Sequence, residues 1–273
     1  MKKYGLENLI SQVRDNNNIN YSFNVSNYKI IWYSDNIFRI KNYEVPVVYG
    51  FKGAGGRIKK WYSPFDDEEV IDLDIRKKTE YKIIKTVYGL ANKNFNNQGS
   101  KLVTLTPAEK IIDVQEANKY FEKFIKRMKH HHGNFIYLAV IQFQDKKADN
   151  HRIHYHMLWD LPYIPQKELL EIWGHGLGSV DIRKIYSVDN LGAYLLRYMG
   201  KSVGDARLYG NKAYLCSKGL KRPLEKFLTD DEFKEIYKKY DLKNRKSSIK
   251  PKGYQTENYG WVTENEYNLK RAY

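Results

Sequence analysis

Short runs of alternating apolar and polar residues over positions 21 to 63 predict strands. The runs are rich in β-branched and aromatic residues and are separated by Asn, Asp and Ser; they read YSFNV, YKIIWYS, NIFRI and VPVVYGF. A period of two is typical of strands with one buried face. With a basic helix at 75–91, they indicate a β-rich N-terminal region over residues 1–95, a candidate for DNA recognition.

A helical period follows the polar break NKNFNNQGS at 92–100 and the β-branched segment KLVTLTP. Asp113 and Glu116 have the spacing of a capping box, and apolar residues then recur every three or four positions. The helix is expected to end at KHHHG, with Gly133 as its C-cap. We interpret the three histidines there as helix-terminal cations, with metal binding as the alternative.

The order of the predicted elements indicates the fold class. After the strand KLVTLTP and the capped helix, the pattern predicts strands at 135–144 and 151–159, a helix at 166–174, a strand at 178–185 and a helix at 190–201. This β-α-β-β-α-β-α order is typical of an α+β fold with a largely antiparallel central sheet backed by helices. We assign residues 96–228 to this domain. Residues 229–273 form a basic C-terminal extension, with a helix starting at TDDE and irregular chain beyond it.

The charge of the chain favours a polyanionic partner. There are 47 Lys and Arg against 32 Asp and Glu, which gives a net charge of +15, and 24 Tyr, 11 Phe and 5 Trp lie among them. Aromatic rings beside cations suit single-stranded nucleic acid, because bases stack on the rings while the cations hold phosphates. The alternative is a basic, tyrosine-rich globular protein with no such partner.

Several classes of protein are excluded by what the sequence lacks. One cysteine, Cys216, cannot form an intramolecular disulfide, and there is neither a signal-peptide pattern nor an apolar run near 20 residues. The stretch GFKGAGGR lacks the Lys-Ser/Thr pair of a phosphate loop. We therefore expect a cytoplasmic protein that is soluble, is not associated with a membrane and has no nucleotide-driven motor.

Three of the seven histidines lie in the strand segment HRIHYHMLW. Residues two apart on a strand face the same side, so His154 and His156 project together. Two imidazoles side by side can hold a divalent cation, with a third ligand from the neighbouring strand, where Gln142 and Gln144 are available. A structural or surface role for the histidines is the alternative.

Two tyrosines share an edge of the predicted helix in DNLGAYLLRYMGKS. At 100° per residue, Tyr194 and Tyr198 lie about 40° apart, and Lys201 falls about 20° beyond Tyr194. A phenol is a poor nucleophile at neutral pH, but a nearby ammonium group or metal lowers the cost of forming the phenolate. Two equivalent tyrosines would permit two successive phosphoryl transfers; the alternative is that they are packing residues.

These segments together resemble rolling-circle replication initiators of the HUH endonuclease superfamily, the two-tyrosine type found in single-stranded DNA phages and plasmids. The resemblance rests on LVTLT, HYH and the Tyr-xxx-Tyr-xx-Lys helix, within residues 95–223. It implies the HUH, ferredoxin-like catalytic fold and a metal-dependent nickase that rejoins single-stranded origin DNA through a 5′-phosphotyrosine, leaving a 3′-OH primer. Host DNA polymerase and helicase are the implied protein partners.

The resemblance also implies roles for individual residues. Tyr198, Tyr194 and Lys201 would be catalytic, Arg197 would bind DNA, and His154, His156 and Gln142 would hold Mg²⁺ or Mn²⁺. Members commonly have Glu at the position of Gln142 and Lys at that of Arg197. The alternatives are another HUH enzyme, a transposase or a relaxase, and a single-stranded nucleic-acid-binding protein without catalytic activity.

Overall fold

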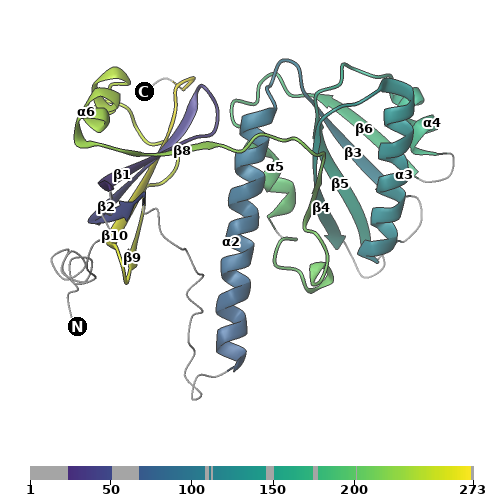
Figure 1. Ribbon diagram of the computed structural model, residues 1–273. Helices are drawn as coiled ribbons and strands as arrows, with labels where there is room; N and C mark the ends of the chain where they lie inside the picture. Colours follow the sequence, from purple (N-terminus) through teal and green to yellow (C-terminus); the bar gives the residue numbers. More distant parts are fainter. Residues whose placement is uncertain are drawn as a thin grey trace, which may run out of the picture.

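The computed structural model describes residues 24–50, 68–107, 111, 113–145, 151–174, 178–200 and 202–271. In these ranges the chain forms two antiparallel five-stranded sheets and five α-helices, which confirms the expected α+β class. Figure 1 shows the two sheets side by side with the long helix α2 (Glu68–Asn94) between them. The predicted GAGG turn and Lys201 lie outside the described residues.

One sheet contains the histidine segment, and we call it the histidine sheet. Its strand order is β6-β3-β5-β4-β7. Its elements, in chain order, are β3 (Lys101–Pro107), α3 (Val114–His132), β4 (Tyr137–Asp145), β5 (His151–Trp159), α4 (Gln166–Trp173), β6 (Gly178–Lys184), α5 (Leu191–Met199), the short 3₁₀ turn η1 (Ala206–Leu208) and β7 (Tyr214–Cys216). The predicted order of strands and helices from residue 101 to α5 is therefore confirmed.

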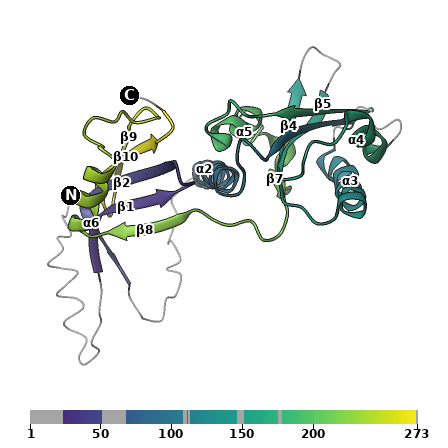
Figure 2. The ribbon, with the colours of Figure 1, turned by 90° about the horizontal axis from the view of Figure 1, so that it is seen from above.

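Alternation along the strands gives the histidine sheet two different faces. Leu105, Ile141 and Tyr155 are fully buried, and Tyr155 stacks on Phe121 of α3 and donates a hydrogen bond to Asn118 of the same helix. The opposite face is covered by α5, as seen from above in Figure 2. Because residues on a strand alternate between faces, the histidines that flank Tyr155 lie on the α5 side.

Helix ends match the signals read from the sequence. The Asp113 side chain caps α3 by accepting from the Glu116 amide, and Gly133 ends the helix with a φ of 76° while its N–H donates to the Lys129 carbonyl. The last helix, α6 (Asp230–Lys239), begins with a complete capping box between Thr229 and Glu232. Each cap satisfies backbone groups that a helix end leaves unpaired.

The second sheet is built from both ends of the chain, and we call it the terminal sheet. Its strand order is β8-β1-β2-β10-β9, with the bounds β1 (Asn24–Trp32), β2 (Ile37–Tyr49), β8 (Leu224–Leu228), β9 (Lys252–Thr256) and β10 (Gly260–Asn268). The structure has two long strands where the sequence predicted short ones. The segments NIFRI and VPVVYGF fall mostly in the single strand β2, because Ile40 and Lys41 continue the strand without a turn. The C-terminal extension is not irregular after its helix, since it supplies β9 and β10.

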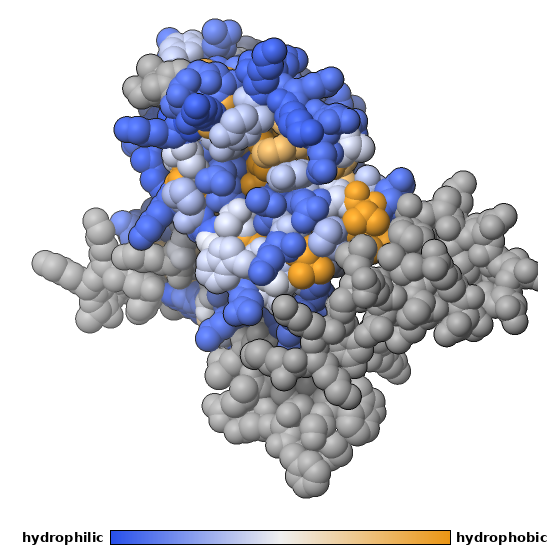
Figure 3. Space-filling model, turned by 90° about the vertical axis from the view of Figure 1, so that its left-hand side faces the viewer, coloured by the Kyte–Doolittle hydropathy of each residue, from blue (hydrophilic) through white to orange (hydrophobic). Residues whose placement is uncertain are grey.

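The terminal sheet also packs on both faces. Ile30, Phe38 and Leu228 form a core with Phe233 and Ile236 of α6. On the other face, Ile31 and Tyr33 pack against Tyr88 of α2. In Figure 3, the coloured surface, which belongs to the described residues, is mostly hydrophilic with small apolar patches. Among the described residues, no helix has the length and apolar character needed to cross a membrane.

Candidate functional site

His154 and His156 lie on β5, in the interior of the histidine sheet, and each is held by a threonine of β3. Thr104 is paired directly with His156 in the antiparallel register. The Thr104 hydroxyl lies 3.1 Å from His156 Nδ1, and the Thr106 hydroxyl lies 3.0 Å from His154 Nδ1. The two rings are parallel within 8°, with centroids 6.4 Å apart. Both imidazoles are therefore oriented through Nδ1, which leaves Nε2 as the outer nitrogen of each ring.

The two Nε2 atoms differ in their partners. His156 Nε2 donates to the amide oxygen of Gln142, at 2.6 Å, and Gln142 faces His154 across the β4–β5 ladder. The Nε2 atom of His154 is buried without a hydrogen-bond partner. A buried polar atom without a partner is costly. A bound cation would supply that partner.

Burial keeps both imidazoles neutral. Burial, together with the charges of His154 and Arg183, lowers the pKa of His156 to about 3. It also lowers the pKa of His154, with a smaller contribution from Arg152. A neutral imidazole is the form that binds metal.

Two imidazole nitrogens and one amide oxygen fit a divalent cation that keeps positions open for phosphate oxygens or water. The hydroxyls of Thr104 and Thr106 can accept from an Nδ1–H as well as donate, so they are compatible with a metal on Nε2. Among the described residues, no group of three or more His, Cys, Asp or Glu side chains is placed to hold a metal ion. A metal at this site would thus depend on Gln142 as its third protein ligand.

The tyrosine helix α5 brings its two phenols to the histidines. The Tyr198 ring stacks on the His156 ring with centroids 3.9 Å apart and an angle of 23°. Its hydroxyl donates to the Tyr194 hydroxyl at 3.1 Å, and both tyrosines are half-buried. Leu195 and Met199 of the same helix are fully buried, so the apolar side of α5 docks on the sheet and carries the phenols with it.

Tyr198 is protonated in this arrangement. Burial, together with the hydrogen bond and charge of Tyr194, raises its pKa to about 12 against the lowering effect of Arg183 and Arg197. A phenol of this kind is a nucleophile only when its proton is removed during the reaction or when a cation stabilises the phenolate. The neighbouring imidazoles and arginines are the groups placed to accept this proton or to stabilise the phenolate.

Two arginines flank the phenols. Arg197, on the exposed side of α5, places its guanidinium 4.5 Å from the centre of the Tyr194 ring. Arg183 on β6 interacts electrostatically with Tyr194 and Tyr198, and its hydrogen bond to Asp181 raises its pKa. The guanidinium of Arg183 is mostly exposed. Guanidinium groups in such positions are suited to bidentate contact with phosphate.

Sequence reasoning identified most of these residues and missed others. The structure brings together His154, His156, Gln142, Tyr194, Tyr198 and Arg197, whereas Gln144 lies opposite Arg152 near the end of the ladder. Lys201 is outside the described residues. Arg183 and Asp181 were missed, although the direct pairing of Asp181 with Thr104 would have placed them here if the β3–β6 register had been known.

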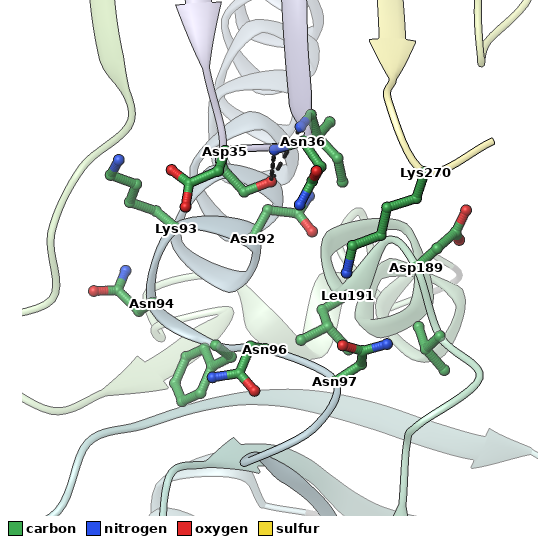
Figure 4. Close-up of a pocket in the computed structure, with 14 residues that line it drawn as sticks. Asp35, Asn36, Asn92, Lys93, Asn94, Asn96, Asn97, Asp189, Leu191 and Lys270 are labelled. Carbon is green, nitrogen blue, oxygen red and sulfur yellow. Dashed lines mark hydrogen bonds between the residues drawn. The ribbon is translucent and has the colours of Figure 1, made fainter.

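A separate hollow lies near the start of α5, between the two sheets (Figure 4). It is about 250 Å³ in volume and is lined mainly by Asn, Asp and Lys side chains. Lys270 reaches into it toward Leu191, and Asn92 and Asp189 form part of its wall. Neither histidine and neither tyrosine of the candidate site lines this hollow.

Comparison with known proteins gives one match. A family model described as replication-associated protein ORF2 matches residues 100–203, which run from the start of β3 to just beyond α5. No curated protein and no solved structure matches the chain. The match supports a replication-associated role, with DNA as the partner, and it covers the threonines, histidines and tyrosines described above.

Metal-free protein should lose stability as the pH falls from about 6.5 toward about 3. The unfolded chain protonates His156 near the ordinary value of 6.5, while burial holds the pKa in the folded protein at about 3. Because the unfolded state then binds more protons, the free energy of unfolding should fall with decreasing pH by up to about 1.4 kcal/mol per pH unit. Urea denaturation in a chelator, repeated across this pH range, measures the slope.

The variant His156→Asn should make that slope shallower. The matched control is His130→Asn, at an exposed position near the end of α3, which should leave the slope as in the original chain. Equal slopes for the original chain and His156→Asn would show that the imidazole is not held neutral by the fold.

Proposed function

Because residues 100–203 match a replication-associated family, we propose that the protein is a rolling-circle replication initiator of the two-tyrosine HUH type. It nicks and rejoins single-stranded DNA at a replication origin. The observation that carries this proposal is the Tyr198 ring stacked on His156, with the Tyr194 hydroxyl 3.1 Å from that of Tyr198. Two candidate nucleophiles and a candidate metal site therefore share one surface.

The proposed reaction exchanges one phosphodiester for another. The phenol oxygen of Tyr198 attacks the scissile phosphorus, a bond forms between them, and the bond from phosphorus to the 3′ oxygen breaks. The proton lost by the phenol ends on the 3′ oxygen, so the products are a 5′-phosphotyrosine and a free 3′-OH. No water or external energy source is required, because the ester bond is conserved in the new linkage.

A divalent cation, Mg²⁺ or Mn²⁺, held by His154, His156 and Gln142 would supply charge neutralisation at the phosphate and favour the phenolate. The rest of the site is supplied by the chain. Thr104 and Thr106 hold the imidazoles by their Nδ1 atoms, so the rings are oriented before DNA binds. Such pre-organisation is one of the larger contributions a protein makes to phosphoryl transfer.

The two tyrosines act in turn. Tyr198 makes the first attack, because its ring is in direct contact with His156. Tyr194 then attacks the regenerated site after one round of synthesis, and the released 3′-OH attacks the first phosphotyrosine and closes the circle. Arg197 and Arg183 hold phosphates beside the two phenols, and the 3′-OH left by the first step is a primer for a host polymerase working with a host helicase.

A non-catalytic single-strand-binding protein is the second candidate. It is favoured by the net charge of +15 and by exposed aromatic side chains such as Tyr186 and Tyr209. Both candidates bind single strands, but only the nickase forms a covalent bond to DNA. Another HUH enzyme, a transposase or a relaxase, would share the chemistry and differ in the DNA site that it joins.

The nickase should form a covalent adduct with single-stranded DNA. Random-sequence single-stranded oligonucleotides, incubated with the protein and Mn²⁺ and run on a denaturing gel, should give a band of protein joined to DNA. Sequencing the DNA of this band identifies the nick site. Tyr198→Phe should weaken the band and the double change at Tyr194 and Tyr198 should abolish it, because no phenol is then left to attack.

The variant Tyr186→Phe is the control, since Tyr186 is exposed and lies outside α5. It should form the adduct as the original chain does. An adduct that survives the double change would exclude these tyrosines as nucleophiles. If the original chain binds single-stranded DNA but forms no adduct, the non-catalytic candidate is favoured.

The metal site should respond to a single added charge. Gln142→Glu places a carboxylate within reach of His156 Nε2 and should tighten Mn²⁺ binding by at least about tenfold, or about 1.4 kcal/mol, because the existing donors are neutral. Electron paramagnetic resonance of free Mn²⁺ measures the affinity without DNA. Gln144→Glu, on the same strand but opposite Arg152, is the matched control; equal tightening by both variants would indicate a general charge effect and not a ligand.

A further inference from the structure

A buried chain of hydrogen bonds joins the terminal sheet to the helix that carries the tyrosines. It begins at Glu266 on β10, whose side chain is fully buried and accepts from the Arg39 guanidinium at 2.9 Å. The Tyr88 hydroxyl on α2 donates to the other oxygen of Glu266 at 2.7 Å. The Asn190 side chain donates to Tyr88, also at 2.7 Å.

Asn190 is the N-cap of the tyrosine helix. Its side-chain oxygen accepts from the Ala193 amide at 2.9 Å and from the Asn92 side chain at 3.0 Å. Asn92 in turn accepts from the Gly192 amide. The unpaired amides at the start of α5 are thus satisfied partly by its own cap and partly by α2.

Close packing fixes the same end of the helix. A Cβ atom at Gly192 would lie 2.6 Å from the Tyr88 carbonyl and 2.5 Å from the Asn92 side chain, so only glycine lets α5 approach α2 this closely. Next to the cap, Asp189 is paired with Arg271 and accepts from Asn268. Asn268 is the last residue of β10, the strand that carries Glu266, and Arg271 follows shortly after it.

We infer that Tyr88, Glu266 and Asn190 act as positioning residues, through which the terminal sheet sets the rotation of α5 and so the placement of Tyr194 and Tyr198 over the histidines. We call these three residues the positioning relay. The inference rests on the proposed function, because it assigns the relay a role in nicking. It gives the terminal sheet an indirect part in nicking, through the position of α5, in addition to any contact with DNA.

The energetics of these buried polar groups indicate that they position α5 and add little to the free energy of unfolding. A buried carboxylate and guanidinium have a large desolvation cost, so such a pair adds little net stability compared with apolar side chains of similar volume. In the relay, the Tyr88 hydroxyl, the Glu266 carboxylate and the Asn190 side chain all have hydrogen-bond partners, and these bonds link the terminal sheet to the start of α5. Burial and the charge of Glu266 raise the pKa of Tyr88, which keeps its hydroxyl protonated and able to donate to Glu266 while it accepts from Asn190.

The same core offers a matched control. Tyr33 packs edge-on against Tyr88 with ring centroids 4.8 Å apart, and it is also buried, but its hydroxyl has no hydrogen-bond partner. Tyr33→Phe and Tyr88→Phe therefore each remove one tyrosine hydroxyl from the same cluster. Only the second change breaks the relay.

The experiment compares Tyr88→Phe, Asn190→Ser and Tyr33→Phe with the original chain, using a single-stranded oligonucleotide that contains the nick site identified from the adduct. Serine keeps an oxygen that caps α5 but lacks the amide that reaches Tyr88. Single-turnover nicking with Mn²⁺ gives the rate constant, and fluorescence anisotropy in a chelator gives the dissociation constant for the intact strand. Thermal unfolding establishes that each variant is folded at the assay temperature.

Tyr88→Phe and Asn190→Ser should each lower the nicking rate constant by at least about tenfold, because a displacement of about 1 Å can cost a factor of about 100. The dissociation constant should change by less than about twofold in both, and Tyr33→Phe should behave as the original chain. Nicking at the original rate by both relay variants would overturn the inference, as would an equal loss in Tyr33→Phe or a loss confined to DNA affinity. An original chain that forms no adduct would instead contradict the proposed function.

Discussion

The pairing of β3 with β5 is the constraint on which the rest of the site depends. It sets Thr104 against His156 and brings Thr106 to His154, so both imidazoles are held on one face of the sheet. A shift of one residue in this register would turn the histidines toward α3 and the buried Tyr155 toward the tyrosine helix. The cores on the two faces are different, and that difference locks the register.

The second requirement is the position of α5 across that face. Its apolar side packs on the histidine sheet, while Leu196 contacts the cluster of Ile31, Tyr33 and Tyr88 that joins α2 to the terminal sheet. Helix α5 is therefore packed between the histidine sheet and the cluster that joins α2 to the terminal sheet. The terminal sheet needs strands from both ends of the sequence, so the placement of the tyrosines depends on the first strands and the last strand together.

Local periodicity was sufficient to predict the parts of this site that lie within single elements. The two-residue spacing of His154 and His156 on a strand and the four-residue spacing of Tyr194 and Tyr198 on a helix determine which side chains share a face. The N-terminal caps of α3 and α6 were also predicted, because each signal spans only four residues, Asp113 to Glu116 and Thr229 to Glu232. The proposed nucleophiles and ligands are among these locally determined residues.

Contacts between distant residues could not be predicted in this way. Tyr88 and Glu266 are 178 positions apart, and nothing in the local sequence of either marks the other. The strand β10 was missed because Glu264 and Glu266 occupy its inward-facing positions, where they pair with Arg39 and Lys41. Charged residues at those positions remove the apolar alternation that identifies a strand. Asp181 and Arg183 were missed for a related reason, since their relevance depends on which strand β6 joins.

The covalent link itself is the most direct test of the account. Trypsin cleaves after Arg197 and so places Tyr194 and Tyr198 on different peptides, Ile185–Arg197 and Tyr198–Lys201. After the adduct is digested with nuclease and trypsin, mass spectrometry should find the nucleotide remnant on Tyr198, and on Tyr194 when Tyr198 is changed to Phe. A remnant on Tyr186, or on any residue outside α5, would contradict the central claim that these two phenols and the histidine pair form one active site.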